Sequence, residues 1–129
     1  MGRRSRRRAA ADRGSRPEKL TAPTSRYTDA EGNTLTLRGA LTPATRREYA
    51  DTLAGTGARA AATVEDTWQR ATELLFERLA VSWTIAGAPI EGQRELLTRY
   101  RAASSAERAW IRDALRAHCA ENFPDVAAP

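Results

Sequence analysis

The segment from residue 63 to residue 86 constrains the fold of this 129-residue chain more than any other. Its apolar residues recur every three or four positions, which is the spacing of one helical face: Val64, Trp68, Ala71, Leu75, Leu79 and Ala86. Other apolar residues flank this row on both sides, so the apolar arc covers about 220°, against ~100° for a surface helix. The pattern predicts one long central helix, enclosed by its neighbours or by a second molecule.

Three more helices are expected around this segment. Thr42-Pro43 is typical of a helix start, with a hydroxyl at the cap and proline at the first helical position. This helix is expected to run to about residue 54. A short helix is expected over residues 91–102, and a last one begins after Ser104, which has capping-box spacing to Glu107.

A β-hairpin is predicted before the first helix, at about residues 26–38. A turn cluster at residues 29–33 separates Tyr27-Thr28 from a strictly alternating stretch at residues 34–38. The alternation places Leu35 and Leu37 on one buried face. The expected fold class is therefore mainly α: a four-helix domain over residues 25–124 that carries a short N-terminal hairpin.

The basic charge of the chain is concentrated at its beginning. Residues 1–20 hold eight basic and two acidic groups, a net charge of +6, and the net charge of the whole chain is +5. Residues 1–24 are rich in Arg, Ser, Pro and Ala, which cannot bury enough apolar surface to offset the entropy of ordering. We therefore expect a disordered basic tail at residues 1–24 and a loose C-terminal end at residues 125–129.

The sequence predicts a cytoplasmic protein without a membrane segment. The single cysteine excludes an internal disulfide, and no apolar run approaches the ~20 residues of a membrane helix. The basic start is followed by only three alanines and then Asp12, whereas a secretory signal needs a longer apolar stretch.

No catalytic, cofactor-binding or metal-binding residues are predicted. The one histidine and the one cysteine are neighbours, His118 and Cys119, and adjacent residues on a helix point about 100° apart, so they do not readily hold one ion. Both lie on or beside an apolar helical face, which favours a structural role. The chain also lacks a phosphate-binding loop and a nucleophile elbow. We therefore expect a protein that is not an enzyme.

Three residues of the predicted central helix are candidates for binding a partner protein: Trp68, Arg78 and Trp83. Arg78 falls inside the apolar arc, where an unpaired charge is costly, so it either extends outward along its methylene stem or faces a partner. The tryptophans are either core anchors or contacts of an interface. Association of the chain with itself is a further option.

Two sets of arginines are candidates for binding nucleic acid. The first lies in the tail and the second forms a stripe at four-residue steps on the last helix: Arg3, Arg4, Arg6, Arg7, Arg8, and Arg108, Arg112, Arg116. The tail either neutralises phosphates or serves as a solubilising linker, and the stripe is either a contact surface or a solvated face.

The order of elements resembles the small tail assembly chaperones of long-tailed bacteriophages and prophages. The resemblance rests on four stretches: Leu35-Thr-Leu-Arg-Gly39, Leu41-Thr-Pro-Ala44, Leu79-Ala-Val-Ser-Trp83 and Ile85-Ala-Gly-Ala-Pro89. It implies a helical, non-enzymatic protein that binds the tape-measure protein and prevents its aggregation while the tail is built. The Arg-rich extension at residues 1–20 departs from that family's pattern.

The functional hypothesis is therefore a protein-binding adaptor or assembly chaperone, with phage or prophage tail assembly as its specific form. The alternative is a nucleic-acid-binding accessory protein, in which the basic tail supplies affinity. Neither hypothesis requires a cofactor.

Overall fold

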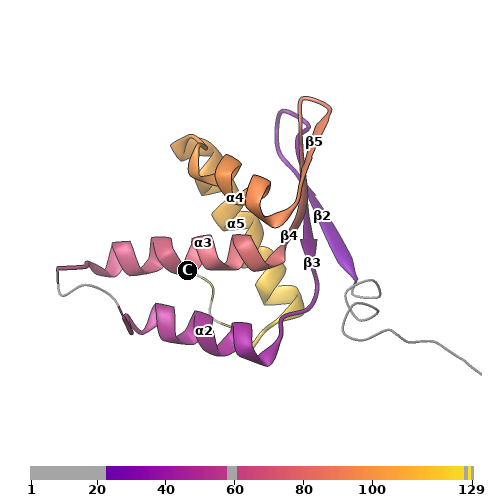
Figure 1. Cartoon of the computed structure of the whole chain (residues 1–129). Coiled ribbons are helices and arrows are strands. Elements are labelled where there is room, and N and C mark those ends of the chain that lie inside the picture. Colours follow the sequence, from indigo (N-terminus) through magenta and orange to yellow (C-terminus); the bar gives the residue numbers. More distant parts are fainter. Residues whose placement is uncertain (1–22, 58–60, 127, 129) are drawn as a thin grey trace, which may run out of the picture.

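The computed structural model describes residues 23–57, 61–126 and 128. Its elements form two layers, an antiparallel sheet in the order β2-β3-β4-β5 and a set of helices packed against one face of that sheet (Figure 1). The elements in chain order are β2 (Thr24–Thr28), β3 (Thr34–Arg38), α2 (Pro43–Leu53), α3 (Val64–Leu79), β4 (Ala80–Ile85), β5 (Ala88–Glu91), α4 (Gln93–Arg101) and α5 (Ser105–Asn122).

The prediction of a mainly α, four-helix domain with only a short hairpin is wrong. The described residues contain four helices, but they also contain a four-stranded sheet, because the segment from 63 to 86 is not one helix. The helix α3 ends at Leu79, and the next six residues form the strand β4, which pairs with β3. Val81, Trp83 and Ile85 are β-branched or aromatic, and such residues favour a strand that has a neighbour to pair with.

A two-residue turn at Ala86-Gly87 joins β4 to β5. Both residues have positive φ, 51° at Ala86 and 82° at Gly87, which is the backbone of the type I′ turn that matches the twist of a hairpin. Ile85 pairs with Ala88 directly beside the turn. The residues that end the predicted helix therefore reverse the chain within the sheet.

The N-terminal hairpin is confirmed, as part of the larger sheet. Thr28 pairs with Thr34, and both Leu35 and Leu37 are fully buried on the face that carries the helices. The predicted helix starts are also confirmed. The Thr42 hydroxyl accepts a hydrogen bond from the Thr45 N–H at 3.1 Å, and Ser104 forms a complete capping box.

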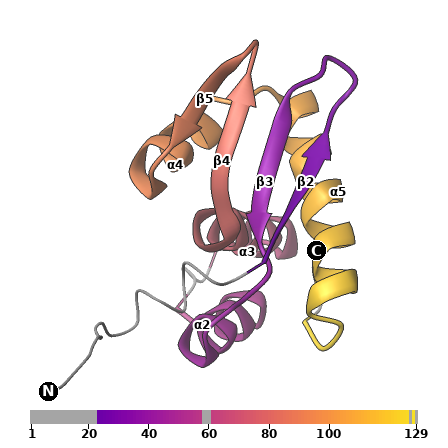
Figure 2. The same cartoon turned by 90° about the vertical axis from the view of Figure 1, so that its right-hand side faces the viewer.

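The core lies between the sheet and the helices. Figure 2 shows α4 behind β5 and β4, and α5 behind β3 and β2, while the opposite face of the sheet carries no helix in the described ranges. The core is built from the inward row of the sheet and from the facing sides of the helices: Leu35, Leu37, Trp83, Leu75, Phe76, Leu79, Leu96, Ile111 and Leu115.

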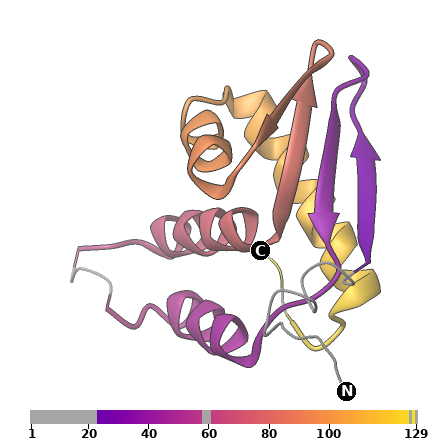
Figure 3. The same ribbon diagram turned by 45° about the vertical axis from the view of Figure 1, so that its right-hand side comes forward.

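The helices α2 and α3 extend away from the sheet as a pair (Figure 3). The second half of α3 therefore packs under the sheet, while its first turns are covered on one side by α2. Residues 1–22 of the predicted basic tail lie outside the described residues. In the C-terminal end that was expected to be loose, Asp125 forms an ion pair with Arg46 at 2.8 Å and Val126 packs against the core.

Candidate protein-binding surface

The first two turns of α3 present two large apolar side chains to solvent. Val64 is 68% exposed and Trp68, one turn later, is 52% exposed. Residues four apart lie on the same side of a helix, so the two side chains form one apolar patch. Farther along the same face, Ala71 and Leu75 are fully buried. The same face of α3 is thus exposed near the start of the helix and buried in the core farther along.

A shallow groove of about 180 Å³ adjoins this patch. The end of α2, the start of α3 and residues next to both line the groove: Leu53, Ala54, Gly55, Ala62, Thr63, Val64, Thr67 and Trp68. We call this set of residues the Trp68 surface. Leu53 is half-buried and packs against the core, so it connects the groove to the protein interior.

A capping box fixes the start of α3 and with it the position of the Trp68 surface. The Thr63 hydroxyl accepts from the Asp66 N–H at 3.0 Å, and the Asp66 carboxylate accepts from the Thr63 N–H at 3.1 Å. This capping box fixes where the helix begins, so the exposed Val64 and Trp68 lie on a regular helix. Such a surface is already ordered before a partner arrives.

Trp83, which the sequence left open as a core anchor or an interface contact, lies in the core. It is 2% exposed, its ring meets Phe76 edge-to-face, and the Arg99 guanidinium lies 4.9 Å from its ring centroid. Its indole N–H has no hydrogen-bond partner in the described part of the protein. The grouping of Trp83 with Trp68 depended on a continuous helix, and the strand β4 turns Trp83 inward.

Arg78 is held by groups of the same chain. Its guanidinium forms an ion pair with Glu48 at 3.0 Å and donates to the Thr45 hydroxyl at 3.1 Å, both on α2. Its backbone carbonyl accepts from the Arg38 side chain at 3.1 Å. An arginine in an apolar arc needs a partner for its charge, and the Glu48 carboxylate of α2 is that partner.

Two of the three arginines of the predicted stripe on α5 have intramolecular partners. Arg108 donates to the Arg101 carbonyl and lies 5.6 Å from the Tyr100 ring centroid, while Arg116 is 3.7 Å from the Asp113 carboxylate. Arg112 is exposed. The other nucleic-acid candidates, Arg3, Arg4, Arg6, Arg7 and Arg8, lie outside the described residues.

The His118-Cys119 pair is buried in the core. His118 is 0% exposed, and its ring nitrogens lie within hydrogen-bond distance of the Tyr27 hydroxyl and the Arg38 carbonyl, both at 2.8 Å. Burial raises the pKa of the Cys119 thiol to about 11, so it carries no thiolate at neutral pH. Among the described residues, no group of three or more His, Cys, Asp or Glu could hold a metal ion.

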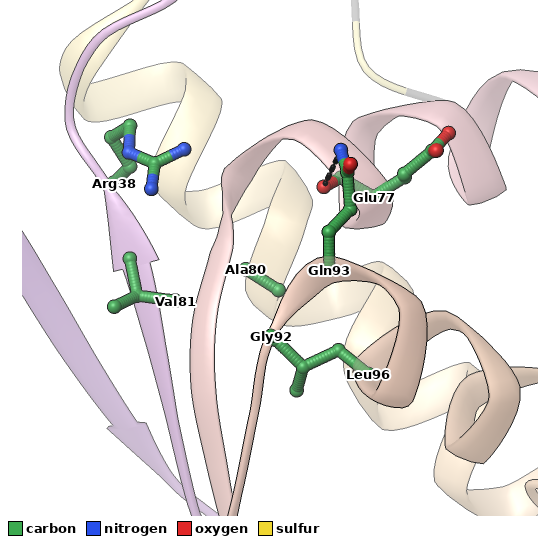
Figure 4. Close-up of a pocket in the computed structure, with 7 residues that line it drawn as sticks. All are labelled: Arg38, Glu77, Ala80, Val81, Gly92, Gln93 and Leu96. Carbon is green, nitrogen blue, oxygen red and sulfur yellow. Dashed lines mark hydrogen bonds between the residues drawn. The ribbon is translucent and has the colours of Figure 1, made fainter. Parts of the chain in front are cut away.

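A second cavity, of about 250 Å³, lies where α3, β4 and α4 meet (Figure 4). The Gln93 amide donates to the Glu77 backbone carbonyl at 3.3 Å across it. In Figure 4 the Glu77 carboxylate points away from the Arg38 guanidinium. The residues that line this cavity therefore do not bring an acid, a base or a nucleophile together: Arg38, Glu77, Ala80, Val81, Gly92, Gln93 and Leu96.

Comparisons with family models, with curated proteins and with solved structures found no match. No helix in the described ranges has both the length and the apolar character to cross a membrane. Of the predicted partner residues, the structure leaves only Trp68 extensively exposed. Leu53 and the groove were not predicted from the sequence, although the Gly55-Thr56-Gly57 stretch shortly after Leu53 is typical of a helix end.

Proposed function

We propose that the protein is a non-enzymatic adaptor or assembly chaperone that binds another protein through the Trp68 surface. The observation that carries this proposal is the exposure of Trp68 and Val64, 52% and 68%, on a helix whose other large apolar residues are mostly buried. Exposed apolar area has a free-energy cost in water, and tryptophan is enriched among the residues that dominate protein interfaces. The groove beside it has room for an apolar side chain of a partner.

The charge beside the Trp68 surface favours a partner with a basic residue next to its apolar anchor. Glu65 follows Val64 and lies three residues before Trp68, so it borders the apolar patch on α3. Its side chain is exposed. A charged residue at the edge of an apolar contact belongs to its polar rim, and it selects the sign of the partner's charge.

In its specific form, the partner is the tape-measure protein of a phage or prophage tail. This part of the proposal rests on the resemblance stated for residues 35–44 and 79–89. In this fold the second of these stretches forms β4, the turn and the start of β5, so a chaperone of this kind would combine a sheet with its helices. The Trp68 surface would then cover apolar segments of the tape-measure protein before they assemble.

Co-purification from the native host, followed by identification of the bound protein, tests the proposal. The wild-type chain is compared with Trp68→Ala and with the control Gln69→Ala, which changes the next exposed residue of the same helix. We expect one defined protein to be retained by the wild type and by Gln69→Ala, and to be lost with Trp68→Ala. A protein that is retained equally by all three chains would contradict the proposal.

The second candidate function is nucleic-acid binding, and the observation that favours it is the net charge of +6 within residues 1–20. A segment with this charge can bind phosphates through electrostatic attraction, and such an affinity falls steeply with salt. The two functions use different parts of the chain, so Trp68→Ala would leave nucleic-acid binding unchanged.

A further inference from the structure

Within the described residues, one edge of β2 has backbone groups that no neighbouring strand uses. In an antiparallel pair, alternate residues direct their N–H and C=O groups toward the partner strand. Asp29 N–H donates to the Asn33 carbonyl at 2.9 Å, and Gly39 N–H donates to the Pro23 carbonyl at 2.7 Å. Odd-numbered residues therefore face β3, while Thr24, Arg26 and Thr28 direct their backbone groups outward.

The other edge of the sheet is protected. The two-residue turn at Ala86-Gly87 makes Ile85 and Ala88 a hydrogen-bonded pair, so Pro89 and Glu91 face outward along β5. Proline has no N–H to donate, so this edge lacks one of the outward donors that an added strand would need. Figure 2 shows β5 and β2 at opposite sides of the sheet. Proteins protect edges that must not pair, so the contrast between β5 and β2 singles out β2 as the edge that can accept a strand.

The charge of Arg26 indicates what kind of strand fits there. Two copies of the chain could pair through antiparallel β2 strands so that all three outward residues of each copy take part. Arg26 of one copy would then lie opposite Arg26 of the other, and directly opposed like charges are unfavourable. The chain's own residues 1–20, with a net charge of +6, would also add like charge beside Arg26 and Arg38. An acidic side chain opposite Arg26 is complementary.

We propose that β2 is a strand-addition site for an extended segment of a partner protein that carries an acidic residue opposite Arg26. Three outward backbone positions supply the hydrogen bonds, and Arg26, which is exposed, selects the charge. On the face toward α5, half-buried Ser25 and Tyr27 flank the added strand, which favours small or β-branched residues at its neighbouring positions. This site lies on a different element from the Trp68 surface and does not depend on it.

A titration of the ¹⁵N-labelled full-length chain with two peptides tests the proposal. The first probe is Thr-Thr-Val-Glu-Val-Thr-Thr with blocked ends, and the second has lysine in place of glutamate. We expect the first peptide to shift the amide signals of Thr24, Arg26 and Thr28 and to slow their hydrogen exchange. The glutamate peptide should bind at least about threefold more tightly than the lysine peptide, because the cross-strand pair at Arg26 changes from attractive to repulsive.

Two variants separate the backbone contribution from the charge. Arg26→Pro removes an outward N–H that β3 does not use, and it should abolish binding of both peptides while the hairpin remains folded. Arg26→Thr keeps that N–H, so it should still bind and should remove the preference for glutamate over lysine. Thermal unfolding shows whether each variant is folded. If Arg26→Pro is not folded, the comparison of Arg26→Thr with the wild type tests the proposal by itself.

Three results would overturn the proposal. One is the absence of shifts at the three outward amides with either peptide at millimolar concentration. Another is a response confined to Val64 and Trp68, which would place peptide binding at the Trp68 surface. The third is a shift of the β2 amides with protein concentration alone, accompanied by a dimer in light scattering, which would make a second copy the occupant.

Discussion

The phenol oxygen of Tyr27 on β2 lies 2.8 Å from Nδ1 of His118 on α5, and Nε2 of the same ring lies 2.8 Å from the Arg38 carbonyl on β3. A carbonyl oxygen only accepts hydrogen bonds, so Nε2 carries the proton and Nδ1 accepts from the Tyr27 hydroxyl. The buried imidazole therefore connects both strands of the N-terminal hairpin to the last helix.

Tyr27→Phe should lower the free energy of unfolding by about 1–2 kcal/mol, because it leaves Nδ1 of a buried ring with only Asn122 at 3.3 Å. Urea denaturation measures the change. Tyr100→Phe is the matched control, since the Tyr100 hydroxyl has no hydrogen-bond partner in the described part of the chain and its loss should cost less than about 0.5 kcal/mol. An equal cost for both substitutions would mean that the Tyr27–His118 contact contributes nothing.

Ala86→Asn should stabilise the protein by about 0.5–1 kcal/mol, because alanine pays for a left-handed backbone that asparagine tolerates in a type I′ turn. The relevant φ is 51°. Thermal unfolding measures the gain, and Ala88→Asn, which makes the same change on the neighbouring strand, should give none. Destabilisation by Ala86→Asn would instead indicate that residue 86 lies in a helix, where asparagine costs about 0.7 kcal/mol relative to alanine.

Stability should fall as the pH rises from about 9 to about 11. Burial raises the pKa of Cys119 from 9.0 to about 11, so over this interval the thiol ionises in the unfolded chain while it stays protonated in the folded one. The unfolded state then releases the proton first, and about 2–3 kcal/mol of stability is lost. The buried tyrosines, whose pKa values are also raised, add to the loss at higher pH.

Comparison of the wild type with Cys119→Ala isolates the contribution of this thiol. The variant is expected to be less stable at pH 7, where it loses packing, but to depend less on pH between 9 and 11. Urea denaturation at several pH values measures both slopes. Parallel curves of stability against pH for the two proteins would contradict the assignment of this pH dependence to Cys119.

Deletion of residues 1–20 tests the nucleic-acid alternative. If the tail binds DNA or RNA, the full chain should lose affinity steeply between 50 and 200 mM salt, about tenfold or more for several phosphate contacts, and the truncated chain should not bind. Fluorescence anisotropy with a labelled oligonucleotide measures both. Equal binding by the two chains would exclude this role for the tail.

The local signals in the sequence predicted the helix starts and the N-terminal hairpin. Thr42, Thr63 and Ser104 each have a side chain that can satisfy the first turn of a helix, and each occupies a cap. The alternation around Leu35 and Leu37 predicted a strand in the same way. These features depend on residues a few positions apart, which is why a sequence reveals them.

Local signals did not decide between a helix and a strand at β4. Trp83 follows Leu79 by four positions and so continues the helical row, whereas Val81, Trp83 and Ile85 alternate as in a strand. The pairing of Trp83 with the distant Leu35 decides for the strand. The exposure of Trp68 depends in turn on where α3 ends and which part of it the sheet covers. Both depend on contacts between segments that are far apart in the sequence. For this reason the sequence alone predicted the same role for Trp68 and Trp83, although only Trp68 is exposed.

Site-specific photo-crosslinking in the native host tests the central claim, that Trp68 lies at a protein interface, most directly. A photoreactive phenylalanine analogue is placed at position 68 and, as the control, at position 69. The account predicts one discrete heterologous crosslink from position 68 and none from position 69. No crosslink from position 68, or the same products from both positions, would contradict it.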